Sequence, residues 1–297
     1  MTEFTCFESD ASSIRLDRQA SVCRHRLMGH PALSLENLAQ VIPALPENQV
    51  FHSTGRLGFS DNFDRAHLEH RPEQGLRDAL EQLRTTNAYI MVRQPETAPS
   101  FRPLLEDLKR DVELLVKAAG VPAGIDEAML YLFIASPNSI TPFHIDRYST
   151  LLLQFRGSKQ VTVFPPWDPR VVSDEDAEQF FARTGRRPAW KPEAEPLGTT
   201  FAFTPGQALH IPFAAGHHVR NGGDDVSISL SIIFNTPETR KIINALALNH
   251  RMRPLMRRLG LSPAPVALGA PGVGSKALAW RMARSVLGGR RRAVSTS

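Results

Sequence analysis

The sequence has little of several features that define whole classes of protein. Only two cysteines, Cys6 and Cys23, occur in 297 residues, which excludes a disulfide-rich scaffold and a cysteine-based zinc site. No apolar run reaches the roughly 18 residues that a membrane-spanning helix requires. The first residues mix acids and bases and do not resemble a signal peptide. We therefore expect a globular, cytoplasmic protein with reduced cysteines.

Charge is also unevenly distributed along the chain. The formal net charge is +5, but residues 237–297 contain twelve Lys and Arg residues against the single acid Glu238, so the rest of the chain is mildly acidic. A basic tail on an acidic body argues against a nucleic-acid groove across the whole surface.

The chain divides into three regions by pattern. Residues 1–125 predict a mixed helical region that flanks the core and shapes the substrate entrance, with helical periodicity at 30–45, where Ser34 is placed as the cap, and at 72–86 and 101–121. Residues 126–236 predict a mainly β core, interrupted by an excursion at 167–198 of part helix and part loop. Residues 237–297 predict a basic helical region. Strand-like, β-branched and aromatic runs, typical of a barrel or jelly roll, occur at 128–136, 149–155, 159–166, 199–203, 207–213 and 225–234.

His144 and Asp146 are the first candidate metal ligands. Residues two apart on a strand point to the same face, so a strand through this segment would present the imidazole and the carboxylate together. Two histidines and one carboxylate form the facial triad of non-haem Fe(II) oxygenases, which leaves coordination positions for substrate and oxygen. The pair therefore requires a second histidine from a later strand.

Three later histidines, His210, His217 and His218, could complete the set. The apolar residues at 209, 211 and 213 share one parity, so His210 is expected to point away from the core. Val219 shares parity with His217, which favours His217 as the inward ligand. A bulge at Gly216 would instead turn His218 inward.

The motifs TPFHID, RGSKQVTVFPP, PGQALHIPFAAGHHV and SISLSIIF resemble those of the JmjC and cupin-like oxygenases. Their layout is similar to that of the asparaginyl hydroxylase that inhibits the hypoxia-inducible factor. Over nearly the whole chain, the amino-acid sequence also resembles a bacterial cupin-like subfamily. The resemblance implies a double-stranded β-helix core with flanking helices, and Fe(II) held by His144, Asp146 and His217.

The resemblance also implies 2-oxoglutarate as co-substrate and O2 as oxidant. Many oxygenases of this fold anchor 2-oxoglutarate with an arginine beyond the second histidine, but the corresponding run VSISLSIIF has no basic residue. JmjC proteins use a lysine on the strand after the H-x-D motif, and Lys159 occupies that place. Thr141 and Thr150 match positions that hydrogen-bond the same co-substrate.

The implied activity is hydroxylation of a small molecule or a protein side chain, with 2-oxoglutarate converted to succinate and CO2; demethylation would begin with the same step. Two alternatives stay open: a metal-binding cupin that acts as an isomerase or sensor, and an interaction protein that acts through its basic C-terminal helices. In the last of these helices, Leu278, Met282, Val286 and Leu287 share one face, which predicts packing or a homodimer in preference to membrane or nucleic-acid binding.

Overall fold

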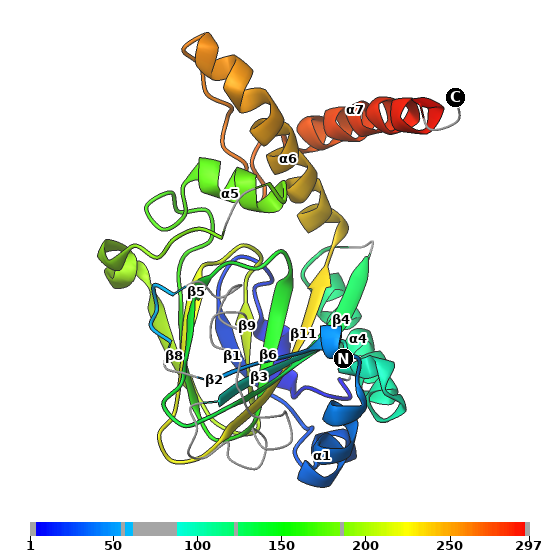
Figure 1. Cartoon of the computed structure of the whole chain (residues 1–297), viewed down its shortest axis with the longest axis vertical. Helices are drawn as coiled ribbons and strands as arrows, with labels where there is room; N and C mark the ends of the chain where they lie inside the picture. The colour runs from blue at the N-terminus through cyan, green and yellow to red at the C-terminus, as the bar shows by residue number, and fades with distance from the viewer. Residues whose placement is uncertain (1–3, 55–56, 62–87, 122–123, 185–186, 295–297) are drawn as a thin grey trace.

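Two antiparallel sheets facing each other form the centre of this computed structural model (Figure 1). The structure describes residues 4–54, 57–61, 88–121, 124–184 and 187–294, with side chains described up to residue 285. The larger sheet contains β4 (Glu127–Ala135), β6 (Ser149–Arg156), β9 (Gln207–Ile211) and β11 (Ser227–Asn235). The smaller one contains β5 (Ile140–His144), β7 (Lys159–Val163), β8 (Thr199–Phe203) and β10 (His217–Asn221). These eight strands, β4 to β11, pass back and forth between the two sheets as a double-stranded β-helix, with β7 and β8 forming a hairpin within the smaller sheet, so the predicted jelly-roll core is confirmed.

The N-terminal region extends the larger sheet at both edges. Strand β1 (Ser21–Arg24) pairs with β9, while β3 (Ala88–Arg93) pairs with β4 and carries β2 (Val50–Thr54) at its outer side. The sequence predicted none of these three strands. Each is short and becomes extended by hydrogen bonding to a sheet edge that the rest of the chain supplies, which a local pattern does not reveal.

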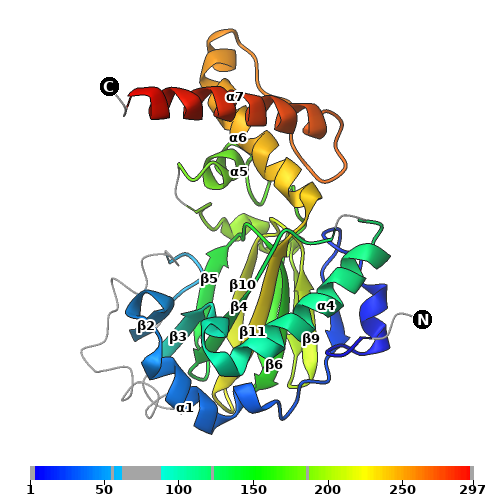
Figure 2. The same ribbon diagram turned by 90° about the vertical axis from the view of Figure 1, so that its right-hand side faces the viewer.

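The space between the two sheets is filled by apolar side chains from both. They come from alternate positions of the strands, as the period of two requires, and include Leu152, Val161, Val163, Phe203, Leu209, Ile211 and Val219. Every residue of β11 is buried, because α4 (Arg102–Ala118) and the N-terminal segments cover its outer face (Figure 2).

The helix predictions for the N-terminal region are confirmed where they can be compared. Helix α1 (Leu35–Ala44) begins as predicted after Ser34, whose hydroxyl accepts a hydrogen bond from Asn37 N at 3.2 Å. Helix α4 occupies the predicted segment at 101–121, and the predicted helix at 72–86 lies outside the described residues. Short 3₁₀ helices occupy Ser9–Ser13, Pro31–Leu33, Glu47–Gln49, Pro95–Thr97, Pro99–Phe101 and Pro192–Leu197.

Three helices lie beyond one end of the barrel (Figures 1 and 2). The predicted excursion contributes α5 (Asp174–Phe181), and the basic C-terminal region contributes α6 (Pro237–Arg258) and α7 (Val273–Val294). Glu178 of α5, 1% exposed, accepts two hydrogen bonds from the Arg253 guanidinium of α6, at 2.5 and 2.7 Å. This bidentate ion pair fixes the excursion against the C-terminal helices.

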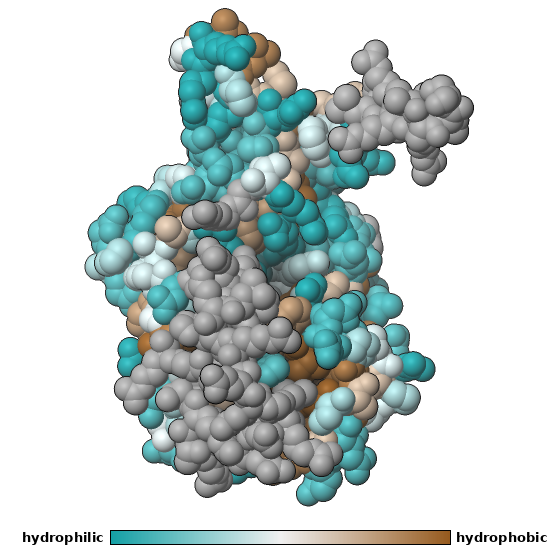
Figure 3. All heavy atoms as spheres, viewed as in Figure 1, coloured by the Kyte–Doolittle hydropathy of each residue, from teal (hydrophilic) through white to brown (hydrophobic). Residues whose placement is uncertain are grey.

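Apolar side chains remain exposed on the C-terminal helices. Leu278 and Met282 of α7 are 55% and 57% exposed, and Leu255 and Leu259 lie near the far end of α6, where Figure 3 shows brown atoms. The predicted homodimer through this face stays a prediction, as does the cytoplasmic location. Among the described residues, no helix is long and apolar enough to cross a membrane.

A buried carboxylate attaches the start of the chain to α4. Asp111 is fully buried and accepts hydrogen bonds from Thr5 N, Cys6 N and Phe7 N, at 3.0, 2.6 and 3.1 Å. Bonds from backbone N–H groups to a buried charge are stronger than neutral ones, so this contact holds the N-terminal segment on the larger sheet's outer layer.

Replacing Asp111 with alanine should therefore lower the free energy of unfolding by about 3 kcal/mol, because buried N–H groups lose their acceptor. Chemical denaturation followed by circular dichroism measures this change. Asp107→Ala is the matched control, one turn earlier on the same helix and partly exposed, and should change the free energy by less than about 0.5 kcal/mol. Equal losses in the two variants would contradict the assigned role.

Candidate metal centre and adjoining cavity

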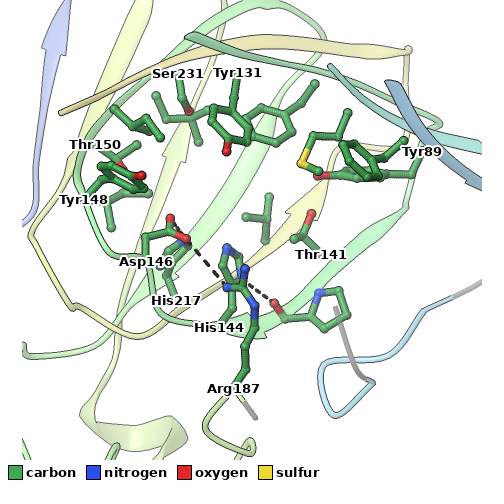
Figure 4. Close-up of a pocket in the computed structure, with 18 of the residues that line it drawn as sticks. Tyr89, Tyr131, Thr141, His144, Asp146, Tyr148, Thr150, Arg187, His217 and Ser231 are labelled. Atoms are coloured by element: carbon green, nitrogen blue, oxygen red, sulfur yellow. Dashed lines mark hydrogen bonds and ion pairs between the residues drawn. The ribbon is translucent and has the colours of Figure 1, made fainter. Parts of the chain in front are cut away.

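His144 and His217 face each other across two neighbouring strands. They are directly opposite in the antiparallel pairing of β5 with β10, and their ring centroids lie 4.1 Å apart. Asp146 follows in the loop, with its Oδ2 3.7 Å from His217 Nε2 (Figure 4). One ligand atom from each of the three residues lies within 4.8 Å of the others. The structure thus brings the predicted triad together.

The expectation that Asp146 lies on the same strand as His144 is wrong. Strand β5 ends at His144, so Asp146 is not on a strand and no alternation of faces applies to it. Ile145 is buried beneath the α5–α6 layer, and the turn around it brings the following carboxylate back to the histidines. Packing, rather than strand period, positions the third side chain.

Backbone carbonyls fix the tautomer of both imidazoles. His144 Nδ1 lies 2.8 Å from Pro142 O, and His217 Nδ1 lies 3.1 Å from Ala215 O. A carbonyl oxygen only accepts, so each Nδ1 carries the proton and each Nε2 carries the lone pair. This is the outer hydrogen bond that orients metal-bound histidines in proteins.

The charges of the site favour the metal-binding protonation states. Burial, together with the nearby His217, lowers the pKa of His144 to about 3. Burial raises the pKa of Asp146, but its electrostatic interactions with His144, His217 and Arg187 outweigh burial, and the net shift is downward. A neutral imidazole and an ionised carboxylate are therefore present at neutral pH, as Fe(II) requires of its ligands.

Arg187, which no sequence motif marks as a site residue, contacts the triad directly. Its Nη1 lies 3.8 Å from Asp146 Oδ1 and donates to Ile145 O at 3.0 Å. The residue follows α5 in the excursion, and the basic run that contains it gives no sign of proximity to the H-x-D motif. A long-range contact of this kind becomes visible only in the fold.

The other two histidines lie in different surroundings. His218 points to the opposite face of β10, where its Nε2 lies 3.1 Å from Glu195 Oε2 and its ring contacts Phe59 at 4.1 Å. A register shift does follow His217 in its pairing with β5, but it does not turn His218 to the triad. His210 lies on the outer face of β9 as its parity predicts, yet it is fully buried because Asp17 covers it.

A cavity of about 380 Å³ opens beside the triad and contains Lys159 in its wall. Lys159 is 4% exposed, and within the described part of the chain its ammonium makes one hydrogen bond, to Asn221 Oδ1 at 2.9 Å, and no ion pair. Burial lowers its pKa to about 7. Gly157, with φ 64°, makes the preceding turn, where a Cβ would lie 2.7 Å from Val226 O. A carboxylate entering the cavity would satisfy the buried ammonium.

Hydroxyl groups line the same cavity. Thr150 Oγ1 is buried and has no hydrogen-bond partner among the described residues, so it can bond to a bound molecule. Thr141 hydrogen-bonds the Tyr89 hydroxyl, and burial raises the pKa of that phenol, which therefore stays protonated. Figure 4 shows these side chains, with Ser231, around the space next to the triad. The donors present fit a dicarboxylate held beside a divalent metal.

Comparisons with known proteins agree with this geometry. The profile of the cupin-like domain family matches residues 47–240. This chain belongs to the cupin-like domain family. A curated relative, Jumonji C domain-containing protein 5 of Drosophila melanogaster, is 27% identical over 143 residues, which are 46% of this chain and 35% of that protein. The matched segment therefore spans about a third of the relative's length.

Two structures of the Escherichia coli ribosomal oxygenase YcfD share the fold of this cupin-like chain. Their TM-scores are 0.50 and 0.51, at 16% and 17% identity. The matches cover 94% and 95% of this chain, and 67% and 68% of theirs. The predicted JmjC/cupin-like family and fold are confirmed. The roles assigned to the individual residues stay predictions.

The buried lysine gives a prediction on stability. Replacing Lys159 with methionine should raise the free energy of unfolding at pH 7, on the order of 1 kcal/mol, because the fold no longer desolvates an ammonium. The folded pKa is lowered from 10.5 to about 7, so the unfolded chain binds more protons between these values and the unsubstituted protein gains stability as pH rises. The advantage of the variant should therefore shrink between pH 7 and pH 10. Thermal unfolding across this range measures it, and a constant advantage would show that the lysine is not desolvated.

Proposed function

We propose that this chain is an Fe(II)- and 2-oxoglutarate-dependent oxygenase that hydroxylates a substrate carbon. One observation carries the proposal: a His-Asp-His cluster of the correct tautomers borders a cavity that contains a buried lysine with no carboxylate partner among the described residues. A metal-binding barrel used for isomerisation or sensing requires the cluster but not the lysine. The shared fold with an oxygenase supports the proposal, and the ribosomal substrate of that enzyme is not carried over.

His144, Asp146 and His217 would hold Fe(II) through two Nε2 atoms and one carboxylate oxygen. When bound, the iron would supply oxygen activation: one atom of O2 enters the substrate C–H bond as a hydroxyl, and the other enters succinate as 2-oxoglutarate loses CO2. Arg187, whose Nη1 lies 3.8 Å from Asp146 Oδ1, would help to keep the carboxylate ionised. All three candidate ligands line the first cavity, so a metal that they held would have its remaining coordination positions available to molecules bound there.

Lys159 would bind the distal carboxylate of 2-oxoglutarate at the inner end of the cavity. Asn221 orients the ammonium, because its Oδ1 accepts from Lys159 while its Nδ2 donates to Ser139 O and Oγ. The Thr150 hydroxyl would donate a hydrogen bond to the same carboxylate. Apolar side chains such as Leu152, Ile211 and Val219 exclude water from this end of the cavity, which strengthens each of these contacts.

The test is production of succinate from 2-oxoglutarate by the protein supplied with Fe(II), ascorbate and O2. His217→Ala should reduce the rate at least about 100-fold, since losing only an outer hydrogen-bond partner of a metal ligand already costs roughly tenfold to 100-fold and losing the ligand itself should cost more. His218→Ala, whose side chain points away from the triad, is the matched control and should retain most of the rate.

Binding of 2-oxoglutarate gives a second readout that does not depend on turnover. Addition of 2-oxoglutarate should change the visible spectrum of the anaerobic Fe(II) protein, and Lys159→Met should abolish that change. A protein that binds metal but shows neither succinate formation nor a spectral response would favour the isomerase or sensor alternative. Loss of activity in His218→Ala but not in His217→Ala would reassign the ligand.

A further inference from the structure

A second cavity adjoins the one beside the triad. Its volume is about 360 Å³, and it lies between the loop after Asp146, the end of α5, and the facing sides of α6 and α7. Arg147, Tyr148 and Arg183 line both cavities, so the two spaces are neighbours with a shared wall. The combined volume matches that of a small-molecule site.

Positive charge dominates the walls of this second cavity. The described residues that line it include four arginines and no carboxylate: Arg147, Arg183, Arg240 and Arg284. The charge of Arg240 is balanced outside the cavity by ion pairs with Asp126 and Glu127. Within the described part of the chain, Arg183 and Arg284 make no ion pair. Asn244 and Trp280 add N–H groups to the lining.

Arg183 adopts a backbone conformation that an arginine rarely takes. Its φ is 60°, in the left-handed region, at the position directly after the C-cap of α5. The N–H of Arg183 bonds to Phe180 O and the N–H of Thr184 bonds to Gln179 O, which is the Schellman arrangement that usually has glycine at this position. An arginine here adds backbone strain without improving the turn, which points to a use for its side chain.

Arg147 is held in place at the shared wall. Its Nε and Nη2 both donate to Phe180 O, and its guanidinium lies 3.7 Å from the centre of the Phe180 ring. These contacts fix the direction of a positive charge close to the triad. The wall is thus preorganised around cationic groups rather than closed by apolar packing.

From these observations we propose that the second cavity binds an anionic group, a carboxylate or a phosphate, of a small-molecule substrate. This inference rests on the proposed function, since it assumes that the same molecule presents a C–H bond to the metal in the first cavity. Arg183 and Arg284 bind the anion, and Arg147 and Tyr148 lie beside the part of the substrate that joins the two cavities. A segment rich in lysine or arginine would be repelled by the same walls.

The experiment measures binding of four probes that share a phenyl ring: phenyl phosphate, phenylacetate, the neutral phenylacetamide and the cationic 2-phenylethylamine. Isothermal titration calorimetry is done on the full chain with Fe(II) and saturating 2-oxoglutarate under anaerobic conditions, so that Lys159 is already occupied. At least one anionic probe should bind more tightly than the neutral and cationic ones. Preference between the first two probes identifies the anion as phosphate or carboxylate.

Two variants and one matched control assign the binding to the cavity. Arg284→Ala and Arg183→Gly should each weaken the anionic probe about tenfold, the effect of one charge-assisted hydrogen bond. Glycine suits the left-handed position, so Arg183→Gly should unfold at the same temperature or higher. Arg281→Ala removes an exposed arginine of the same helix that does not line the cavity, and should leave probe affinity unchanged.

Equal binding of the neutral or cationic probe, no binding of any probe at millimolar concentration, or equal losses in Arg281→Ala and Arg284→Ala would each overturn the subsite. Its failure is separable from that of the proposed function. Succinate formation without arginine-dependent anion binding would support the proposed oxygenase activity and contradict the proposed anion subsite. Arginine-dependent anion binding without 2-oxoglutarate turnover would support the anion-binding cavity and contradict the proposed oxygenase activity.

Discussion

The pairing of β5 with β10 is the constraint on which the site depends. These strands are far apart in the sequence, and their antiparallel register places His144 directly opposite His217. A shift by one residue would turn one of the two imidazoles to the other face of the sheet. Strand β7 on the far side of β10 fixes the same register, and its first residue, Lys159, lies opposite Asn221. One small sheet therefore positions two candidate metal ligands and the candidate carboxylate anchor together.

Burial of polar groups around this sheet has opposite effects on function and on stability. The Lys159 ammonium lies among apolar strands with one neutral hydrogen-bond partner in the described structure, which disfavours its charge in the fold. The same desolvation strengthens its attraction for an incoming carboxylate. Thr150 likewise has a buried hydroxyl with no hydrogen-bond partner among the described residues. A bound molecule that supplied the missing hydrogen bonds would account for both buried polar groups.

Local patterns in the sequence were sufficient for six of the eight barrel strands and pointed to the candidate ligands, because strand-like runs and the H-x-D motif depend on residues close together in the chain. The short ligand-bearing strands β5 and β10 were not among the predicted runs. Nor were local patterns sufficient for β1, β2 and β3, which are extended only because a sheet edge is available. Arg187 and Arg183 were missed for a related reason. The excursion that contains them folds back through the Glu178–Arg253 ion pair, a contact between segments with no common pattern.

The first strand of the chain has a particular place in the order of assembly. Strand β1 pairs only with β9 in the described sheet, and Asp17 just before it accepts hydrogen bonds from Ser149 Oγ and Phe213 N. Strand β9 and Phe213 lie in the last third of the 297 residues, so neither exists until most of the polypeptide has been synthesised. The N-terminal residues therefore leave the ribosome long before their binding edge is formed, and the edge of β9 stays open until they return. Such late closure by non-local contacts is slow, and it makes the completion of the larger sheet, rather than the formation of any helix, the step most exposed to misassociation.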